Sequence, residues 1–182
     1  EAHSFRGVDS PNETIQSVPF VSTFDSIAPA HPYFEDSLRQ GITTIFVAPG
    51  NWTQIGGQGC VVRPTGNTAE KMTVVKNHAI KLSLQPPQGV SRMAHLASLR
   101  KEFDDMLEYL RDLEAQKTVK TVTGPGAKSP EIEVKKETMA RLLTGKSDGF
   151  VYCPTAADVL KAIEQSKQYK FKMKLVLGRD TW

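Results

Sequence analysis

The sequence lacks the features that mark membrane and nucleic-acid-binding proteins. No apolar run approaches the roughly 20 residues that a helix needs to cross a bilayer. The net charge of +3 comes without a dense Lys/Arg cluster, because the basic residues of 167–174 are interleaved with apolar ones. The first residues do not form a signal peptide. We therefore expect no membrane and no nucleic acid among the partners.

Cysteine is scarce as well, and its scarcity excludes a disulfide framework. The chain has two cysteines, Cys60 and Cys153, and neither belongs to a C-x-x-C pair. Both lie among apolar residues, which is typical of buried free thiols. A zinc site built on cysteine would need further ligands that the neighbouring sequence does not supply. What is present fits one globular domain: 182 residues, of which 39% are hydrophobic and 24% charged.

Segments typical of strands and of helices alternate along the chain. Apolar, β-branched stretches at 42–48, 79–84, 149–153 and 173–177 are typical of strands, and the clearest helix covers 95–116, where apolar residues recur at three- and four-residue steps. This alternation predicts an α/β protein with a parallel sheet and right-handed crossovers. If another strand begins upstream, about five strands are expected, too few for a closed eight-stranded barrel.

Local signals define the ends of some elements. Pro32 and Gly41 bracket a short predicted helix, and Thr155 can cap the helix that follows residues 149–153. We expect a glycine-rich loop over 51–59 with a short strand after it. Residues 117–133 lack apolar periodicity, which predicts a mobile surface insertion. We expect the whole chain, 1–182, to form a single partial domain.

Ligands of parallel α/β proteins bind at the carboxyl ends of the strands, so the residues there are candidates for chemistry. His3 follows the first predicted strand, and a neutral imidazole is the commonest metal ligand. Taken alone, a histidine in this place is more often a structural hydrogen-bonding residue. The other histidines, His31, His78 and His95, are predicted to lie at the surface in loops or at helix edges.

Four motifs follow one another in a fixed order. They are EAHSFRGV at 1–8, FEDSLRQGITT at 34–44, VAPG at 47–50 with IGGQG at 55–59, and AADVLKAI at 156–163. In that order they resemble the D-A-H-x-H-x-G strand end and the ALRxGVTT passage of the amidohydrolase superfamily, and the PGxxNxIGGQ loop and ADDIxxAL helix of its imidazolonepropionase-like branch. The resemblance covers most of the chain. It implies a partial TIM-type (β/α) barrel, in which parallel strands alternate with helices.

The resemblance also implies an activity, metal-dependent hydrolysis of non-peptide C–N bonds in amides or cyclic amides, with zinc or another divalent metal as cofactor. His3 corresponds to one metal ligand, but Phe5 replaces the second histidine and has no lone pair to offer. Residues 152–154 (YCP) replace the family's H-A-H strand end, and residues 176–178 (VLG) replace its E-H-G. We therefore predict a degenerate metal site that holds either a weakly bound metal or none.

Two other residues are candidate metal ligands, since some family members use a carboxylated lysine, here Lys81, and a thiolate such as Cys153 can bind zinc. The resemblance implies that substrate is bound by the glycine-rich stretch and by the loop that precedes it. The predicted substrate-binding residues are Asn51, Gly56, Gly57 and Gln58.

Three interpretations stay open. The chain is an amidohydrolase-like domain with impaired or absent catalysis (a pseudoenzyme), or part of a working hydrolase whose metal ligands are rearranged or supplied beyond residue 182, or a non-enzymatic α/β domain that binds a ligand or a partner. The expected partners are a small molecule, the remaining barrel half or a partner chain, and a second copy of the chain. The sequence does not identify the compartment. The cytoplasm is the default expectation, and an upstream signal sequence stays open.

Overall fold

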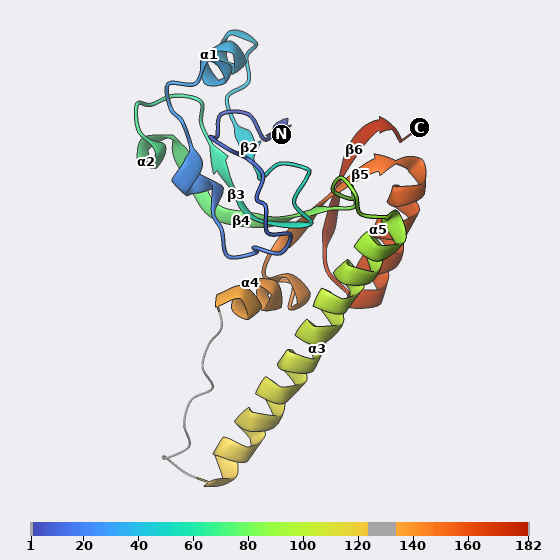
Figure 1. Ribbon diagram of the computed structural model, residues 1–182. Helices are drawn as coiled ribbons and strands as arrows, with labels where there is room; N and C mark the ends of the chain where they lie inside the picture. Colours follow the sequence, from blue (N-terminus) through green and yellow to red (C-terminus); the bar gives the residue numbers. More distant parts are fainter. Residues whose placement is uncertain (1, 124–133, 182) are drawn as a thin grey trace.

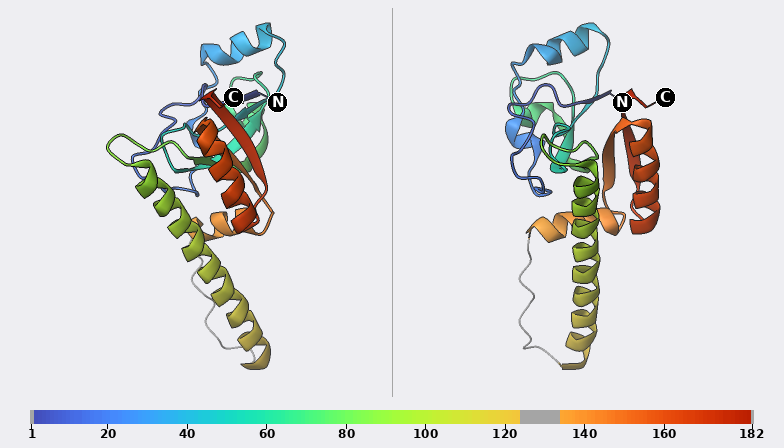
Figure 2. Two further views of the ribbon diagram at one scale, coloured as in Figure 1. Left: turned by 90° about the vertical axis from the view of Figure 1, so that its right-hand side faces the viewer. Right: turned by 45° about the vertical axis from the view of Figure 1, so that its right-hand side comes forward.

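The computed structural model describes residues 2–123 and 134–181, and it contains one mixed sheet (Figure 1). The order of the strands across the sheet is the order along the chain. The strands are β1 (Ala2–Ser4), β2 (Ile45–Val47), β3 (Ile55–Val62), β4 (Thr73–Ser83), β5 (Asp148–Thr155) and β6 (Met173–Asp180). The described part thus has six strands rather than the expected five, and the sheet is curled like one half of a barrel (Figure 2).

The directions of the strands correct the prediction of an all-parallel sheet. β1 is parallel to β2, and β4, β5 and β6 are parallel to one another, but β3 is antiparallel to both of its neighbours. The reason is the length of the connections, because a parallel crossover needs roughly a dozen residues or more. Residues 48–54 are too few for one, so the chain turns back on itself. Five strands nevertheless point the same way, and their carboxyl ends form one edge.

The glycine-rich stretch belongs to strand β3, which corrects its prediction as a loop. Gly57 has φ +94°, a conformation that glycine adopts without strain. A Cβ atom there would lie 2.5 Å from the backbone oxygen of Val21, so the N-terminal segment can approach this strand only because the side chain is absent. Register shifts at this point bend the strand. Glycine marks a bulge and a close backbone approach here.

The helices and the N-terminal segment cover one face of the sheet, which we call the outer face (Figures 1 and 2). Thr155 is the N-cap residue of α5, as predicted, and its backbone N–H donates to the Asp158 carboxylate over 3.1 Å. The helices are η1 (Thr23–Ser26), α1 (Pro32–Arg39), α2 (Ala69–Met72), α3 (Arg92–Thr123), α4 (Val134–Leu143) and α5 (Ala156–Tyr169).

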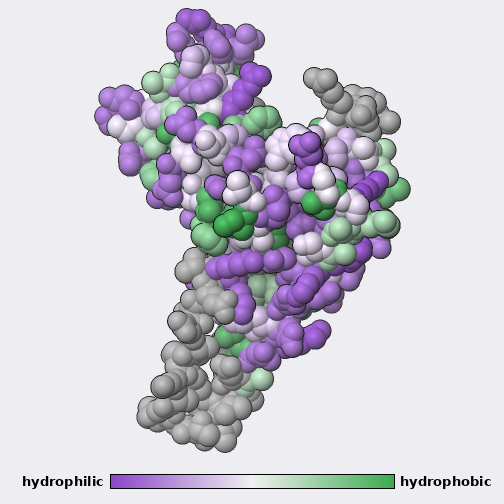
Figure 3. Space-filling view, viewed as in Figure 1, coloured by the Kyte–Doolittle hydropathy of each residue, from purple (hydrophilic) through white to green (hydrophobic). Residues whose placement is uncertain are grey.

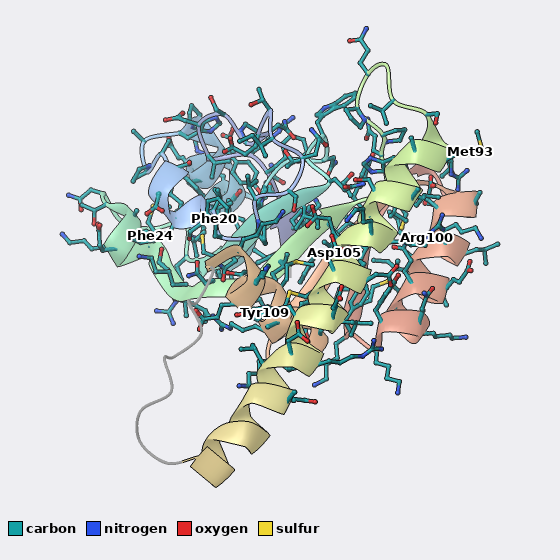
Figure 4. The ribbon with its side chains drawn as sticks, turned by 60° about the horizontal axis from the view of Figure 1, so that its bottom comes forward. Phe20, Phe24, Met93, Arg100, Asp105 and Tyr109 are labelled. Atoms are coloured by element: carbon teal, nitrogen blue, oxygen red, sulfur yellow. The ribbon has the colours of Figure 1, made fainter. Side chains whose placement is uncertain are left out.

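The longest helix, α3, follows the predicted apolar periodicity. Leu99 and Phe103 are fully buried against the sheet and the other helices, and Arg100, Asp105 and Tyr109 follow along the helix (Figure 4). The helix continues through Thr123, seven residues into the segment predicted as an insertion. The rest of that segment, residues 124–133, lies outside the described residues.

Three groups of buried residues form the core. The largest lies between β3–β5 and helices α3–α5, and a second lies between β2, β3 and the N-terminal segment. The third, with Phe46 and Phe150, is on the opposite face, which we call the inner face. The surface in Figure 3 is largely hydrophilic, with small scattered apolar groups. None of the helices in the described ranges combines the length and apolarity required to cross a membrane.

Candidate functional site

Lys81 is the centre of the candidate site. It lies in β4 and is 0% exposed, because alternate residues of a strand point to opposite faces and Lys81 points to the inner one. Its Nζ lies 2.7 Å from Asn51 Oδ1 and 3.2 Å from His3 Nε2. Three residues that the sequence identified separately therefore meet at one atom. We call these three residues, His3, Asn51 and Lys81, the Lys81 cluster.

Aromatic rings line the inner face beside the Lys81 cluster. Phe46 and Phe150 pack with ring centroids 4.2 Å apart, and the His3 ring lies 6.0 Å from each of them. The Tyr152 ring lies 5.6 Å from Lys81 Nζ. The amine is therefore held in apolar surroundings that exclude water, with two polar contacts.

Burial shifts both titratable groups of the cluster toward their neutral forms. It lowers the pKa of Lys81 to about 7, because an ammonium ion loses hydration there and none of the described residues places a carboxylate beside it. The pKa of His3 is lowered to about 4, first by burial and then by the charge of Lys81. Near pH 7 the imidazole is neutral, and a large share of the amine is neutral too.

Asn51 is held in place by the loop between β2 and β3. Ser83 Oγ donates to its backbone oxygen over 2.6 Å, which ties the loop to the end of β4. The next residue, Trp52, donates its N–H to Asn12 Oδ1 over 2.9 Å, which ties the loop to the N-terminal segment. The end of β4 and the N-terminal segment therefore hold the backbone of the loop from which the Asn51 side chain reaches Lys81.

Cys153 is not brought to the Lys81 cluster. It lies on β5 next to Tyr152, so its side chain points to the outer face and is buried in the largest core group. Burial raises the pKa of its thiol to about 12. The side chain is thus a neutral, core-packed thiol on the other side of the sheet from Lys81.

Gly56, Gly57 and Gln58 lie in β3 and are separate from the Lys81 cluster. The backbone N–H of Gln58 donates to the oxygen of Val21 over 2.7 Å, and Thr23 Oγ1 donates to the oxygen of Gln58 over 3.2 Å. These contacts hold the N-terminal segment along the strand. Of the four residues predicted to bind substrate, the structure places Asn51 alone at the amine.

The described residues do not bring a set of metal-ligating side chains together at the strand ends. A catalytic zinc takes three protein ligands and leaves one open position. The described residues contain no group of three or more His, Cys, Asp or Glu side chains that converge in this way. His3 Nε2 faces an amine, and Phe5 is 43% exposed and carries no donor.

His95 was predicted to lie at the surface, and this prediction is wrong. It is 3% exposed, its Nε2 lies 2.9 Å from the backbone oxygen of Ser83, and its own backbone oxygen accepts from Gln54 Nε2 over 2.6 Å. The helical spacing could have identified it, because His95 precedes the buried Leu99 and Phe103 by four and eight residues. It supports the end of β4 from the outer face.

Comparison with known proteins supports the fold. No family model and no curated protein matches the chain. The structure is similar to the crystal structure of an amidohydrolase from Thermotoga maritima MSB8, with a TM-score of 0.83 and 23% sequence identity. The match covers 96% of this chain and 49% of that chain, so this chain spans about half the length of that protein. The comparison confirms a half-barrel α/β fold, similar to the matching part of that protein.

Proposed function

We propose that the chain is half of an amidohydrolase-like barrel domain, from the imidazolonepropionase-like branch, in which metal-dependent hydrolysis of C–N bonds is impaired. In this proposal the edge formed by the carboxyl ends of the strands binds a small molecule and holds no catalytic metal. The fold supports the comparison with hydrolases, and the side chains at the strand ends support the loss of the metal.

The contact between Lys81 and His3 carries this proposal. A neutral imidazole binds a metal through one nitrogen lone pair. Lys81 Nζ lies 3.2 Å from His3 Nε2, so an N–H of the amine can donate to that lone pair. When Lys81 is protonated, its positive charge also repels a cation at this position. The remaining candidate ligand, Cys153, lies on the outer face.

Metal content of the natural-length protein tests the proposal. The protein is exposed to zinc, iron and manganese, dialysed, and measured by elemental mass spectrometry alongside a His3→Gln variant. We expect both proteins to hold well under one metal per chain and neither to hydrolyse a panel of cyclic amides. About one tightly held metal per chain in the wild type, lost in His3→Gln, would contradict the proposal.

A partner-binding role is favoured by strand β6, at one edge of the sheet. Leu175 and Leu177 are paired with Val151 and Cys153, so they point to the outer face, yet they are 38% and 52% exposed. Their counterparts on β5 are buried under helices. We propose that the remaining barrel half, in the same polypeptide or in a partner chain, pairs with β6 and covers these leucines.

A further inference from the structure

The sheet has a second free edge, at strand β1. Among the described strands, β1 pairs with β2 alone and β6 pairs with β5 alone. The two edge strands run in the same direction, since β1 and β2 point the same way as β4, β5 and β6. A half that continues the curl of the sheet from β6 with parallel strands can therefore also end on β1, which leaves no free edge.

A groove lies beside this edge, between one face of α1 and the chain that follows β1. It has a volume of about 340 Å³, and Arg6 lines it from the chain after β1. The residues that line it from the helix recur at three- and four-residue steps and include Tyr33, Ser37 and Gln40. The two walls are held close together, because Gly7 has φ +82° and packs on the Phe34 ring, with which a Cβ atom would collide.

Arg6 is a charged side chain in this groove without a charged partner among the described residues. Its backbone N–H donates to Ser4 Oγ over 2.9 Å, but none of the described carboxylates forms an ion pair with its guanidinium group. Asp36 also lines the groove, and its carboxylate lies 3.8 Å from Arg39 Nη1. A guanidinium group binds a carboxylate through two parallel N–H donors, so a carboxylate is the partner that suits this position.

We propose that the remaining barrel half closes on the β1 edge as well and places an Asp or Glu side chain in the groove, against Arg6. Phe5 precedes Arg6 and is 43% exposed, so an apolar ring and a free cation lie together at this edge. Aromatic residues and arginine are enriched in protein interfaces. This inference rests on the proposed function, because it needs the barrel half that covers β6, and it adds a second seam and the charge of the contact.

Hydroxyl-radical footprinting of the natural-length protein tests the inference. The radical oxidises side chains that solvent reaches, and peptide mass spectrometry gives the rate at each residue. Phe20 is the matched control for Phe5, because it is 47% exposed and lies in the segment that runs along β3 (Figure 4). We expect Phe5 to be oxidised several-fold more slowly than Phe20. Equal rates in the folded protein would overturn the inference.

The same data separate this inference from the interface at β6. Leu177, which is 52% exposed, reports on that interface, with Leu160, 70% exposed, as its control. Slow oxidation of Leu177 with fast oxidation of Phe5 would contradict closure at β1 and leave the pairing at β6 standing. Fast oxidation of both would contradict both. If Phe5 becomes protected only after succinate is added, the groove binds a free carboxylic acid, and the inference is wrong.

Charge variants of the natural-length protein test the contact at Arg6. In Arg6→Glu two carboxylates would meet in the groove, so Phe5 should be oxidised several-fold faster than in the wild type, whereas Arg6→Lys should keep most of the protection. Arg39→Glu is the control, because Arg39 pairs with Glu35 within α1 over 2.6 Å, and it should leave Phe5 protected. Unchanged protection of Phe5 in Arg6→Glu would rule out the proposed carboxylate.

Discussion

At the scale of single residues, the burial of Lys81 lowers the free energy of unfolding. The size of this effect should depend on pH. The amine has a pKa of about 7 in the folded protein and its ordinary value of 10.5 in the unfolded chain. Between these values the unfolded state binds more protons, so the free energy of unfolding rises with pH. Below about pH 7 the full penalty is present.

The first prediction follows from this rise of the free energy of unfolding with pH. Replacing Lys81 with Met keeps an unbranched side chain that is one atom shorter and removes its titration. Urea denaturation of wild type and Lys81→Met between pH 6 and 10 should show that the variant is more stable at pH 6 and that its advantage shrinks as pH rises. The difference should change by an amount on the order of 4 kcal/mol across the range. A difference that does not depend on pH would show that the lysine is not desolvated.

At the scale of elements, the features that the sequence predicted were those set by local chemistry. Pro32 and Thr155 begin the helices that their residue types indicate, and the apolar periodicity identified α3. The direction of β3 could not be read from alternation of segments, because it depends on the length of the connection before it. The pairing of His3 with Lys81 was likewise hidden, since 78 residues separate them.

The second prediction concerns how β3 packs on the inner face. A Cβ atom added at Gly59 would lie 2.5 Å from the Phe46 ring. We expect Gly59→Ala to displace that ring and lower the free energy of unfolding by roughly 1–3 kcal/mol. Gly56→Ala is the control, because its added Cβ would meet Pro49 at 3.1 Å and needs a smaller adjustment. Equal losses in urea denaturation would argue against a specific role of Gly59.

At the scale of the whole molecule, the uncovered leucines of β6 give the third prediction. Residues 1–182 expressed by themselves should associate in light-scattering experiments, because an unpaired strand edge and exposed apolar side chains favour contact between chains. Leu177→Lys should reduce this association. Leu160→Lys, on the surface of α5 where Leu160 is 70% exposed, should have little effect. A monomeric wild type would count against the proposed interface with a second barrel half.

The strand order of the sheet has a consequence for synthesis on the ribosome. Each strand from β2 to β6 pairs with the strand made just before it. The sheet can therefore grow one strand at a time as the chain emerges, although β5 joins β4 only after helices α3 and α4 have been made. The contacts of β3 with β2 and β4 form quickly, because these segments are close in sequence and little chain entropy is lost in closing them. Lys81 would then become enclosed late, when β5 brings Tyr152 to it, after His3 and Asn51 have already been made.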